Sequence, residues 1–489
     1  MLNKLLNRIF LIGTSALIAL TLIFSSCKKD NVFDTDPSLK LIFSSDSISF
    51  DTVFTTVGSF TNQLKVYNPS TKSIKISSIN LTNGNDSFFK INIDGTPTSG
   101  ATDIELAAED SLYIFIKVTI NPNDEDSPFV ISDQIIFNLN GNTQDVDLVA
   151  WGQNANYIIA DTYVQGLPPY KIVAHEFSDT TWTSEKPFLI YGYAVVDSNA
   201  ILRISAGTKI HFHNNSGLWI YKGGAIKVIG ELESPVTFQG DRLEEFYSEI
   251  PGQWDRIWIN EGSIDNEFEY AVIKNGFIGI QAETLQENMG NQLTLKNTII
   301  KNMSGIGILS RFYNISGSNN VVANCGNYCA AFTMGGNYNF IHTTIANFWS
   351  NSIRQTPSLF LNNYYYDSNE VIHPVDLNVS FGNSIVYGNN DEEIQYDEDA
   401  GAEFNYIFDH CDLKTELNIT NPISYLNCLK NENPLFVDYE SNNYMPDSLS
   451  PIRNIGSLPI AEIVPLDIMD NGRTESPDLG AYEFIPGSN

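Results

Sequence analysis

The chain has 489 residues, of which 27 are basic and 58 acidic, so its formal net charge is −31. Such a surface repels phosphate backbones, and we therefore expect no nucleic-acid partner. Charged residues make up only 17% of the chain and aromatic residues 12%, which is typical of a β-rich globular protein and not of a disordered acidic one.

Residues 1–26 have the features of a bacterial lipoprotein signal peptide. Lys4 and Arg8 precede the apolar stretch 9–24, whose sixteen residues are fewer than the roughly 20 that a membrane-spanning helix needs. Two serines then lead directly to Cys27. We expect cleavage before Cys27 and acylation of its thiol, so that a lipid anchors the mature chain to the membrane.

Two alternatives to this anchor stay open, namely a soluble secreted protein cut nearby and an uncleaved signal anchor. Lys28 follows the cysteine, and not the Asp that resembles an inner-membrane retention signal. The outer membrane of the bacterial envelope is therefore the expected location. A periplasmic and a surface-facing position of the body are both compatible with this location.

After a tether over residues 27–37, residues 38–154 alternate in short apolar segments separated by turn residues, which predicts an antiparallel β-sandwich. The order of these apolar segments and turns resembles that of the major-sperm-protein-like immunoglobulin domains that precede other modules in bacterial surface proteins. The resemblance implies a spacer or interaction module. The expected strands are Ser47–Phe54, Gln63–Tyr67, Leu112–Ile120 and Gln134–Leu139.

Residues 155–486 carry a recurring unit of a β-branched pair, one variable residue and an asparagine. Four copies place these asparagines 27, 22 and 23 residues apart, and Ile385–Asn389 repeats the unit with one residue inserted. A period of 20 to 30 residues with β-branched strands predicts a parallel β-helix. The four copies are Val272–Asn275, Ile299–Asn302, Val321–Asn324 and Thr344–Asn347.

The recurring asparagines are interpreted as scaffold and not as catalytic residues. Asparagine tolerates a left-handed backbone in a turn, and its amide can bond to the amide of the asparagine one coil away. His211, His213 and His410 are likewise interpreted as wall or ladder residues of the coils. The four cysteines after Cys27 are compatible with disulfides and with buried free thiols.

The C-terminal part of the chain resembles the right-handed parallel β-helix proteins of the pectate-lyase-like superfamily. The strings that carry the resemblance are Ala206–Phe212, Gly223-Gly224 with Pro235–Phe238, and Pro477–Phe484. It implies a polysaccharide as the substrate class. From about residue 449 the chain is expected to cap the exposed strand edge of the β-helix, with ion pairs among Asp467, Asp470, Arg473, Asp478 and Glu483.

The catalytic patterns of that superfamily are missing from the sequence. The chain has no Asp-Asp dipeptide, no Gly-His-Gly, no Arg-x-Lys and no Arg-x-Pro-x-x-Arg. We therefore expect binding of a polysaccharide or another surface partner without catalysis. The alternative is a polysaccharide lyase, epimerase or glycoside hydrolase whose groups come from separate coils.

The excursion 240–258 is the first candidate site. It holds acids, guanidinium groups and an aromatic platform that suit a sugar: Asp241, Arg242, Glu245, Trp254 and Arg256. The alternative interpretation is an ion-paired loop whose tryptophans pack on the outer wall.

An acidic loop is the second candidate site. It contains Asp391, Glu392, Glu393 and Asp397, and clustered carboxylate oxygens suit calcium. The alternative is a solvated charged loop. No other cofactor is expected.

Overall fold

The structure is a computed structural model that describes residues 33–122, 129–284, 292–473 and 475–487. The predicted signal peptide and Cys27 lie outside these residues, so the lipid anchor stays a prediction. No described helix is long and apolar enough to cross a membrane. The chain divides into two compact units, an N-terminal one that ends at Gly152 and a C-terminal one that continues from Gln153.

The N-terminal unit is a β-sandwich of two five-stranded sheets, ordered β1-β3-β8-β5-β6 and β2-β10-β9-β4-β7. Alternate side chains of each strand enter the core between the sheets; in β8, Leu112, Ile114 and Ile116 are buried. The strands are β1 (Ile42–Phe43), β2 (Ser47–Phe54), β3 (Asn62–Tyr67), β4 (Ile74–Leu81), β5 (Phe89–Ile93), β6 (Thr96–Thr98), β7 (Gly100–Leu106), β8 (Ser111–Val118), β9 (Phe129–Leu139) and β10 (Asn142–Gln153).

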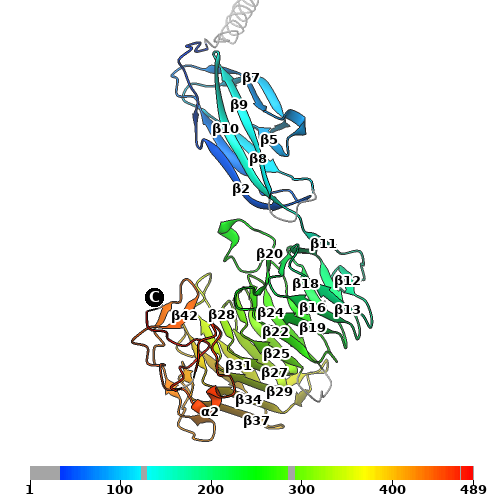
Figure 1. The fold of residues 1–489 in the computed structure, drawn as a ribbon, viewed down its shortest axis with the longest axis vertical. Coiled ribbons are helices and arrows are strands. Elements are labelled where there is room, and N and C mark those ends of the chain that lie inside the picture. Colours follow the sequence, from blue (N-terminus) through cyan, green and yellow to red (C-terminus); the bar gives the residue numbers. More distant parts are fainter. Residues whose placement is uncertain (1–32, 123–128, 285–291, 474, 488–489) are drawn as a thin grey trace, which may run out of the picture. The chain divides into compact units, whose positions relative to one another are not determined.

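The C-terminal unit is a parallel β-helix whose strands stack coil upon coil (Figure 1). We name its three faces A, B and C by the strands that pair within each. Face A contains β12 (Tyr170–Ala174), β15 (Tyr193–Val196), β18 (Gly217–Ile220), β21 (Ile257–Ile259), β24 (Ile278–Glu283), the first halves of β27 (Ile306–Ser318) and β29 (Ala330–Ile341), β31 (Leu359–Asn362) and β36 (Ile394–Asp397).

Face B continues each coil after a turn. It contains β13 (Asp179–Trp182), β16 (Ile201–Ser205), β19 (Ala225–Ile229), β22 (Asn266–Glu269), β25 (Leu293–Lys296), the second halves of β27 and β29, β34 (Leu377–Gly382), β37 (Phe404–Asp409) and β39 (Tyr425–Leu426). All of these strands pair in parallel, as the sequence period predicts.

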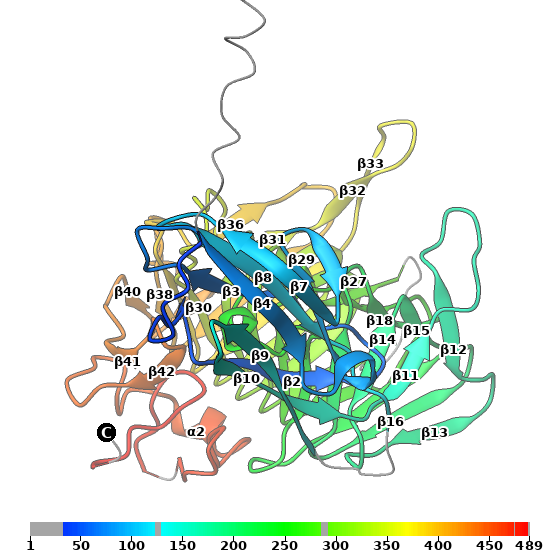
Figure 2. The same cartoon turned by 90° about the horizontal axis from the view of Figure 1, so that it is seen from above.

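Face C closes each coil as an 11-stranded parallel sheet. Its strands are β11 (Asn156–Ile159), β14 (Phe188–Tyr191), β17 (Lys209–Phe212), β20 (Val236–Gly240), β23 (Ala271–Lys274), β26 (Ile299–Met303), β28 (Val321–Cys325), β30 (Thr344–Asn347), β35 (Ile385–Gly388), β38 (Asp412–Leu413) and β40 (Leu429–Lys430). A hairpin of β32 (Tyr364–Tyr366) and β33 (Ile372–Pro374) projects from the coils (Figure 2).

The register on face C confirms the predicted repeat residue by residue. Ile299 pairs with both Val272 and Val321, and Thr344 pairs with Val321 and then with Ile385. The second residue of each β-branched pair points inward and is buried, as Ile300 is. The all-β prediction of a sandwich followed by a parallel β-helix is therefore confirmed.

Three of the four recurring asparagines occupy left-handed turns, but their amides do not bond to one another. Asn275, Asn302 and Asn324 have φ of 66°, 57° and 53°. The amide of Asn302 donates to Glu249, and that of Asn324 donates to Asn442 at 2.8 Å. These side chains fasten neighbouring segments to the coils, so their scaffold role holds with different partners.

A second series of left-handed turns joins faces B and C. In this series the Asn319 amide donates to Asn297, one coil earlier, at 3.0 Å. This is the type of amide-to-amide bond that we predicted for the recurring asparagines. His410 occupies this turn with a φ of 52°. The full series is Tyr270, Asn297, Asn319, His342, Asn383, His410 and Asn427.

The segment after the last coil lies along the outside of face C, which differs from the predicted cap over the end of the stack. It contains β41 (Phe436–Asp438), β42 (Asn443–Pro446) and the short helix α2 (Leu458–Ala461). Buried Arg473 donates to Asn319, Ala481 donates to Thr344 at 2.9 Å, and Gly480 donates to Asn383 at 2.7 Å. Apolar positions on the outer surface of face C, such as Val321 and Ala323, need this cover.

Candidate functional site

Trp254, predicted as an aromatic platform for a sugar, lies inside the β-helix. It is 1% exposed, and its ring stacks on Phe212 with centroids 4.5 Å apart. Its Nε1 donates to the carbonyl of Lys274 at 2.8 Å, and a Cβ at Gly276 would come within 2.8 Å of the ring. Trp254 is therefore a core residue, because the chain has already rejoined the wall at this position, and it cannot contact a ligand.

The other predicted residues of this excursion make separate local contacts. Asp241 accepts a bond from His213 at 2.7 Å, and burial raises the pKa of its carboxyl. Arg242 pairs with Glu244 at 3.1 Å and lies over the ring of Tyr247. Glu245 is exposed at the start of the short 3-10 turn that ends at Tyr247.

The excursion is held against the coils by the carboxylate of Glu249. Lys274 reaches it at 3.4 Å and Lys301 at 3.1 Å, and the Asn302 amide also donates to it. These bonds match the alternative interpretation of an ion-paired loop packed on the wall.

The acidic loop does not gather its carboxylates around one point. Glu393 is fully buried and pairs with Arg354 at 2.6 Å, while Glu392 accepts from Thr415 at 2.6 Å. Asp397 accepts from Tyr364 at 2.9 Å, and Asp391 is exposed. No group of three or more His, Cys, Asp or Glu within the described residues could hold a metal ion, so the four predicted ligands form no calcium site in this structure.

The outer surface of face A carries a row of aromatic side chains that the sequence prediction missed. Trp219 and Trp258 pair in register on β18 and β21, and their rings stack with centroids 5.0 Å apart. Tyr170 and Tyr221 contact Trp219 edge-on, at 6.1 and 5.5 Å. Tyr221 is 41% exposed and so offers its ring to solvent.

A groove of about 550 Å³ adjoins this row. The Trp258 Nε1 donates to Glu283 at 2.6 Å, so the row is bonded to the groove wall. Within the described part of the chain, the side chains of Lys222 and Glu261 form no hydrogen bond or ion pair. The lining residues are Tyr221, Lys222, Asn260, Glu261, Glu283, Thr284, Arg311 and Met334.

Glu283 already accepts four donors. Its Oε1 receives Trp258 at 2.6 Å and Asn260 at 3.4 Å. Its Oε2 receives Gln281 at 2.9 Å and Arg311 at 3.1 Å. Because a carboxylate offers about four lone-pair sites, the acceptor capacity of Glu283 is filled. Glu283 therefore organises the groove and is poorly placed to take a proton from a ligand.

Arg256 is the one predicted residue that connects to this groove. It pairs with Asp255 at 2.9 Å and donates to Gln281, which in turn donates to Glu283. The strings Leu218-Trp-Ile220 and Ile257-Trp-Ile259 could have revealed the row. In each, a tryptophan alternates with inward aliphatic residues and must therefore point outward.

Comparisons with known proteins show no family for this chain. No family model matches the chain, and no curated protein matches it. Among 22 solved chains that match is a family 123 glycoside hydrolase from Clostridium perfringens, known for glycolipid glycan hydrolysis. It is 9% identical with a TM-score of 0.18, and the aligned part covers 24% of this chain and 28% of that chain. A similarity at this level carries no argument about the fold or the site.

Proposed function

We propose that this protein is a lipid-anchored envelope lipoprotein whose β-helix binds a polysaccharide on the outer surface of face A, without catalysis. The observation that carries the proposal is the groove with charged side chains, which the exposed ring of Tyr221 lines. Trp258 adjoins this groove through its bond to Glu283 and stacks on Trp219, which is itself only 6% exposed. Aromatic faces pack on the apolar faces of sugar rings, and polar groups around them fix the orientation of the ligand. The resemblance of the C-terminal strings to pectate-lyase-like proteins supports the same ligand class.

The hydrogen bonds of Glu283 favour binding over catalysis. Hydrolysis of a glycosidic bond ordinarily needs a pair of carboxyl groups, one to give a proton and one to activate water or attack. In this groove Glu283 is filled by its four donors, which leaves Glu261 as the single carboxylate with free acceptor sites. Lys222 and Arg311 then suit the recognition of sugar hydroxyl or carboxylate groups.

The anchor rests on the sequence of residues 1–27. Cys27→Ser should remove the lipid, so that the protein moves from the outer-membrane fraction to the soluble fraction. Mass spectrometry of the N-terminal peptide would show a diacylglyceryl group on Cys27 of the native protein. An unmodified N-terminus elsewhere, or a retained segment 9–24, would contradict the anchor and leave the binding proposal to its own test.

The binding proposal is tested with the mature chain and a polysaccharide panel, with and without calcium. Retention on immobilised glycan and the release of new reducing or unsaturated ends are measured together. We expect retention without new ends, unchanged by calcium, and a loss of at least tenfold in affinity for Trp258→Ala and Tyr221→Ala. Phe246→Ala is the matched control, since Phe246 is 76% exposed and does not line the groove.

Two results would overturn this proposal. Retention that survives both groove substitutions would place binding elsewhere. New chain ends that disappear in Glu261→Gln would show an enzyme that acts through this groove.

A further inference from the structure

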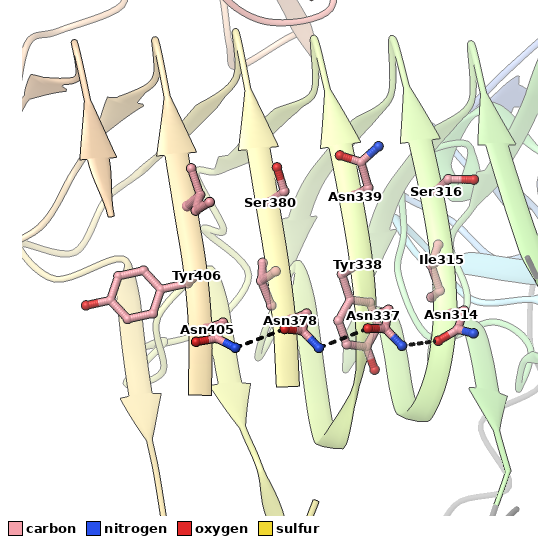
Figure 3. A pocket seen from close by; sticks show the side chains of 12 residues that line it. Asn314, Ile315, Ser316, Asn337, Tyr338, Asn339, Asn378, Ser380, Asn405 and Tyr406 are labelled. Carbon is pink, nitrogen blue, oxygen red and sulfur yellow. Dashed lines mark hydrogen bonds between the residues drawn. The ribbon is translucent and has the colours of Figure 1, made fainter. Parts of the chain in front are cut away.

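An amide ladder crosses the outer surface of face B. Asn314, Asn337, Asn378 and Asn405 pair in register on β27, β29, β34 and β37. Each amide donates to the one before it, at 2.8, 3.0 and 3.1 Å (Figure 3). The ladder borders a groove of about 500 Å³ whose polar lining also includes Ser316, Asn339 and Ser380.

The inner members of the ladder keep unused hydrogen-bonding capacity. An asparagine amide has two N–H donors and two acceptor lone pairs. Asn337 and Asn378 each use one donor and one lone pair in the ladder, and in the residues that the structure describes their amides have no other bonds. Both side chains are exposed. Each therefore presents one donor and one acceptor to solvent, in an orientation that its neighbours fix.

This surface is uncharged, although the chain carries a large negative charge. None of the twelve residues that line the groove is Asp, Glu, Lys, Arg or His. Earlier coils of the same face are charged, with Glu267 between Lys227 and Lys296 at 3.7 and 2.9 Å. An ionic ligand would find no counter-charge at the ladder, whereas hydroxyl groups match alternating donors and acceptors.

The ladder also repeats at the spacing of the coils. Neighbouring strands lie about 4.8 Å apart, so the four amides span about 14 Å. A chain molecule with regularly spaced hydroxyl groups can contact several amides at once, which raises its affinity without any new type of contact. An isolated small molecule would gain little from the repetition.

We propose that the amide ladder is a second binding surface, for an uncharged polysaccharide chain. Face A and face B are different faces of each coil, so this surface acts independently of the groove beside Trp258. The proposal therefore stands or falls separately from the function assigned to face A.

The test uses the full mature chain in native gels that contain dextran, mannan, a soluble β-glucan or, as the anionic comparison, polygalacturonate. We expect at least one neutral glycan to retard the protein, and the double variant Asn337→Ala/Asn378→Ala to weaken that retardation at least tenfold. Asn337→Asp/Asn378→Asp keeps the side-chain shape but adds charge, and should abolish it. Asn214→Ala, at an exposed asparagine outside the groove, should have no effect.

Thermal unfolding of each variant checks the fold. If the double variants unfold early, Asn405→Ala replaces them, because Asn405 ends the ladder and makes one bond in it. No retardation by any neutral glycan, or equal retardation of wild type and ladder variants, overturns the proposal. A loss that appears equally in Trp258→Ala would show one continuous site and would also overturn it.

A separate observation concerns the last coil. Asp412 pairs with Leu429 across β38 and β40, which places the preceding residues, Cys411 and Cys428, side by side in adjacent coils. Strands about 4.8 Å apart bring Cα atoms within the range that a disulfide spans. Both thiols are free in this structure, and Cys428 is partly exposed while Cys411 is buried.

We infer that Cys411 and Cys428 form a disulfide in the exported protein, a statement that rests on the proposed envelope location. The two thiols lose two protons and two electrons, and an oxidising disulfide of a thiol-exchange catalyst takes them up and becomes a dithiol. The Cys411 thiol holds the pKa of Cys428 below its ordinary value, which favours the thiolate that starts exchange. The remaining pair, Cys325 and Cys329, is fully buried and closed to such a partner.

Alkylation and peptide mapping of the full chain test this inference. We expect a linked Cys411–Cys428 peptide from envelope-derived protein, and the same link when purified reduced protein meets oxidised glutathione. Alkylation of both residues without reduction in each arm overturns the disulfide. The link in the glutathione arm alone, together with an unmodified Cys27 in the same map, would instead locate the failure in the proposed export.

Discussion

The buried ion pair of Arg354 and Glu393 allows a sharp prediction about stability. The guanidinium meets the carboxylate at 2.6 and 2.8 Å, and the two side chains are 2% and 0% exposed. Glu393→Ala leaves the guanidinium buried without its counter-charge, and removal of one partner of such a pair costs about 3–5 kcal/mol. For a unit of this size, about 2 °C per kcal/mol corresponds to a melting temperature lower by roughly 6–10 °C.

Differential scanning calorimetry of the full chain measures this loss. Asp391→Ala is the matched control, because Asp391 is an exposed neighbour in the same loop, and its melting temperature should stay within about 1 °C of wild type. The double variant Arg354→Met/Glu393→Leu should recover much of the loss, since it removes both buried charges together.

Two results would refute the reasoning. Glu393→Ala that melts with the wild type would show that Arg354 finds another partner or leaves the interior. The other result is stabilisation of the loop by calcium through Glu393: if calcium raises the melting temperature of the wild type but not that of Glu393→Ala, the metal-site interpretation of this loop is favoured.

Three further predictions concern single side chains. Trp254→Ala should cost about 3–5 kcal/mol in the free energy of unfolding, because it empties a core position. Trp258→Ala should cost less but should lose glycan retention. Chemical denaturation and retention assays separate the two variants, and equal stabilities would contradict the prediction. Burial raises the pKa of Asp412 to about 8, so the carboxyl stays protonated in the native state while the unfolded chain ionises it, and stability is lost as pH rises from 3.8 to 8. The melting temperature of Asp412→Asn should therefore exceed that of wild type by a margin that grows over this range. A constant margin in calorimetry would contradict the prediction. Burial lowers the pKa of His211 to about 4. Between pH 6.5 and 4 the imidazole is therefore protonated in the unfolded chain but neutral in the native state, so stability falls as pH falls through this range. His211→Gln should flatten that fall, and an unchanged slope in pH-dependent calorimetry would show that other groups cause it.

The β-helix could be predicted from the sequence because stacked coils turn sequence repeats directly into spatial neighbours. The strings around Asn275 and Asn302 align in the chain as their strands align in register. Inward positions follow from the same alignment, since β-branched residues recur at each of them. The turn asparagines could be assigned as scaffold for the same reason, although their bonding partners could not.

The candidate site could not be predicted as well, because excursions between coils hide the register. The direction of Trp254 depends on where the chain rejoins the wall after residue 240, and no sequence pattern marks that point. The partner of Glu393 is Arg354, 39 residues earlier. The amide ladder has intervals of 23, 41 and 27 residues, because the hairpin of β32 and β33 lengthens one coil.

The C-terminal segment along face C has a consequence for how the β-helix unfolds. In a simple solenoid each coil touches only its neighbours, so the stack can open coil by coil from an end. Here one segment bonds to Asn319, Thr344 and Asn383, which belong to three successive coils. These coils can separate only after the segment has detached from all of them, so the segment couples their unfolding. We expect this half of the stack to open in a single cooperative step.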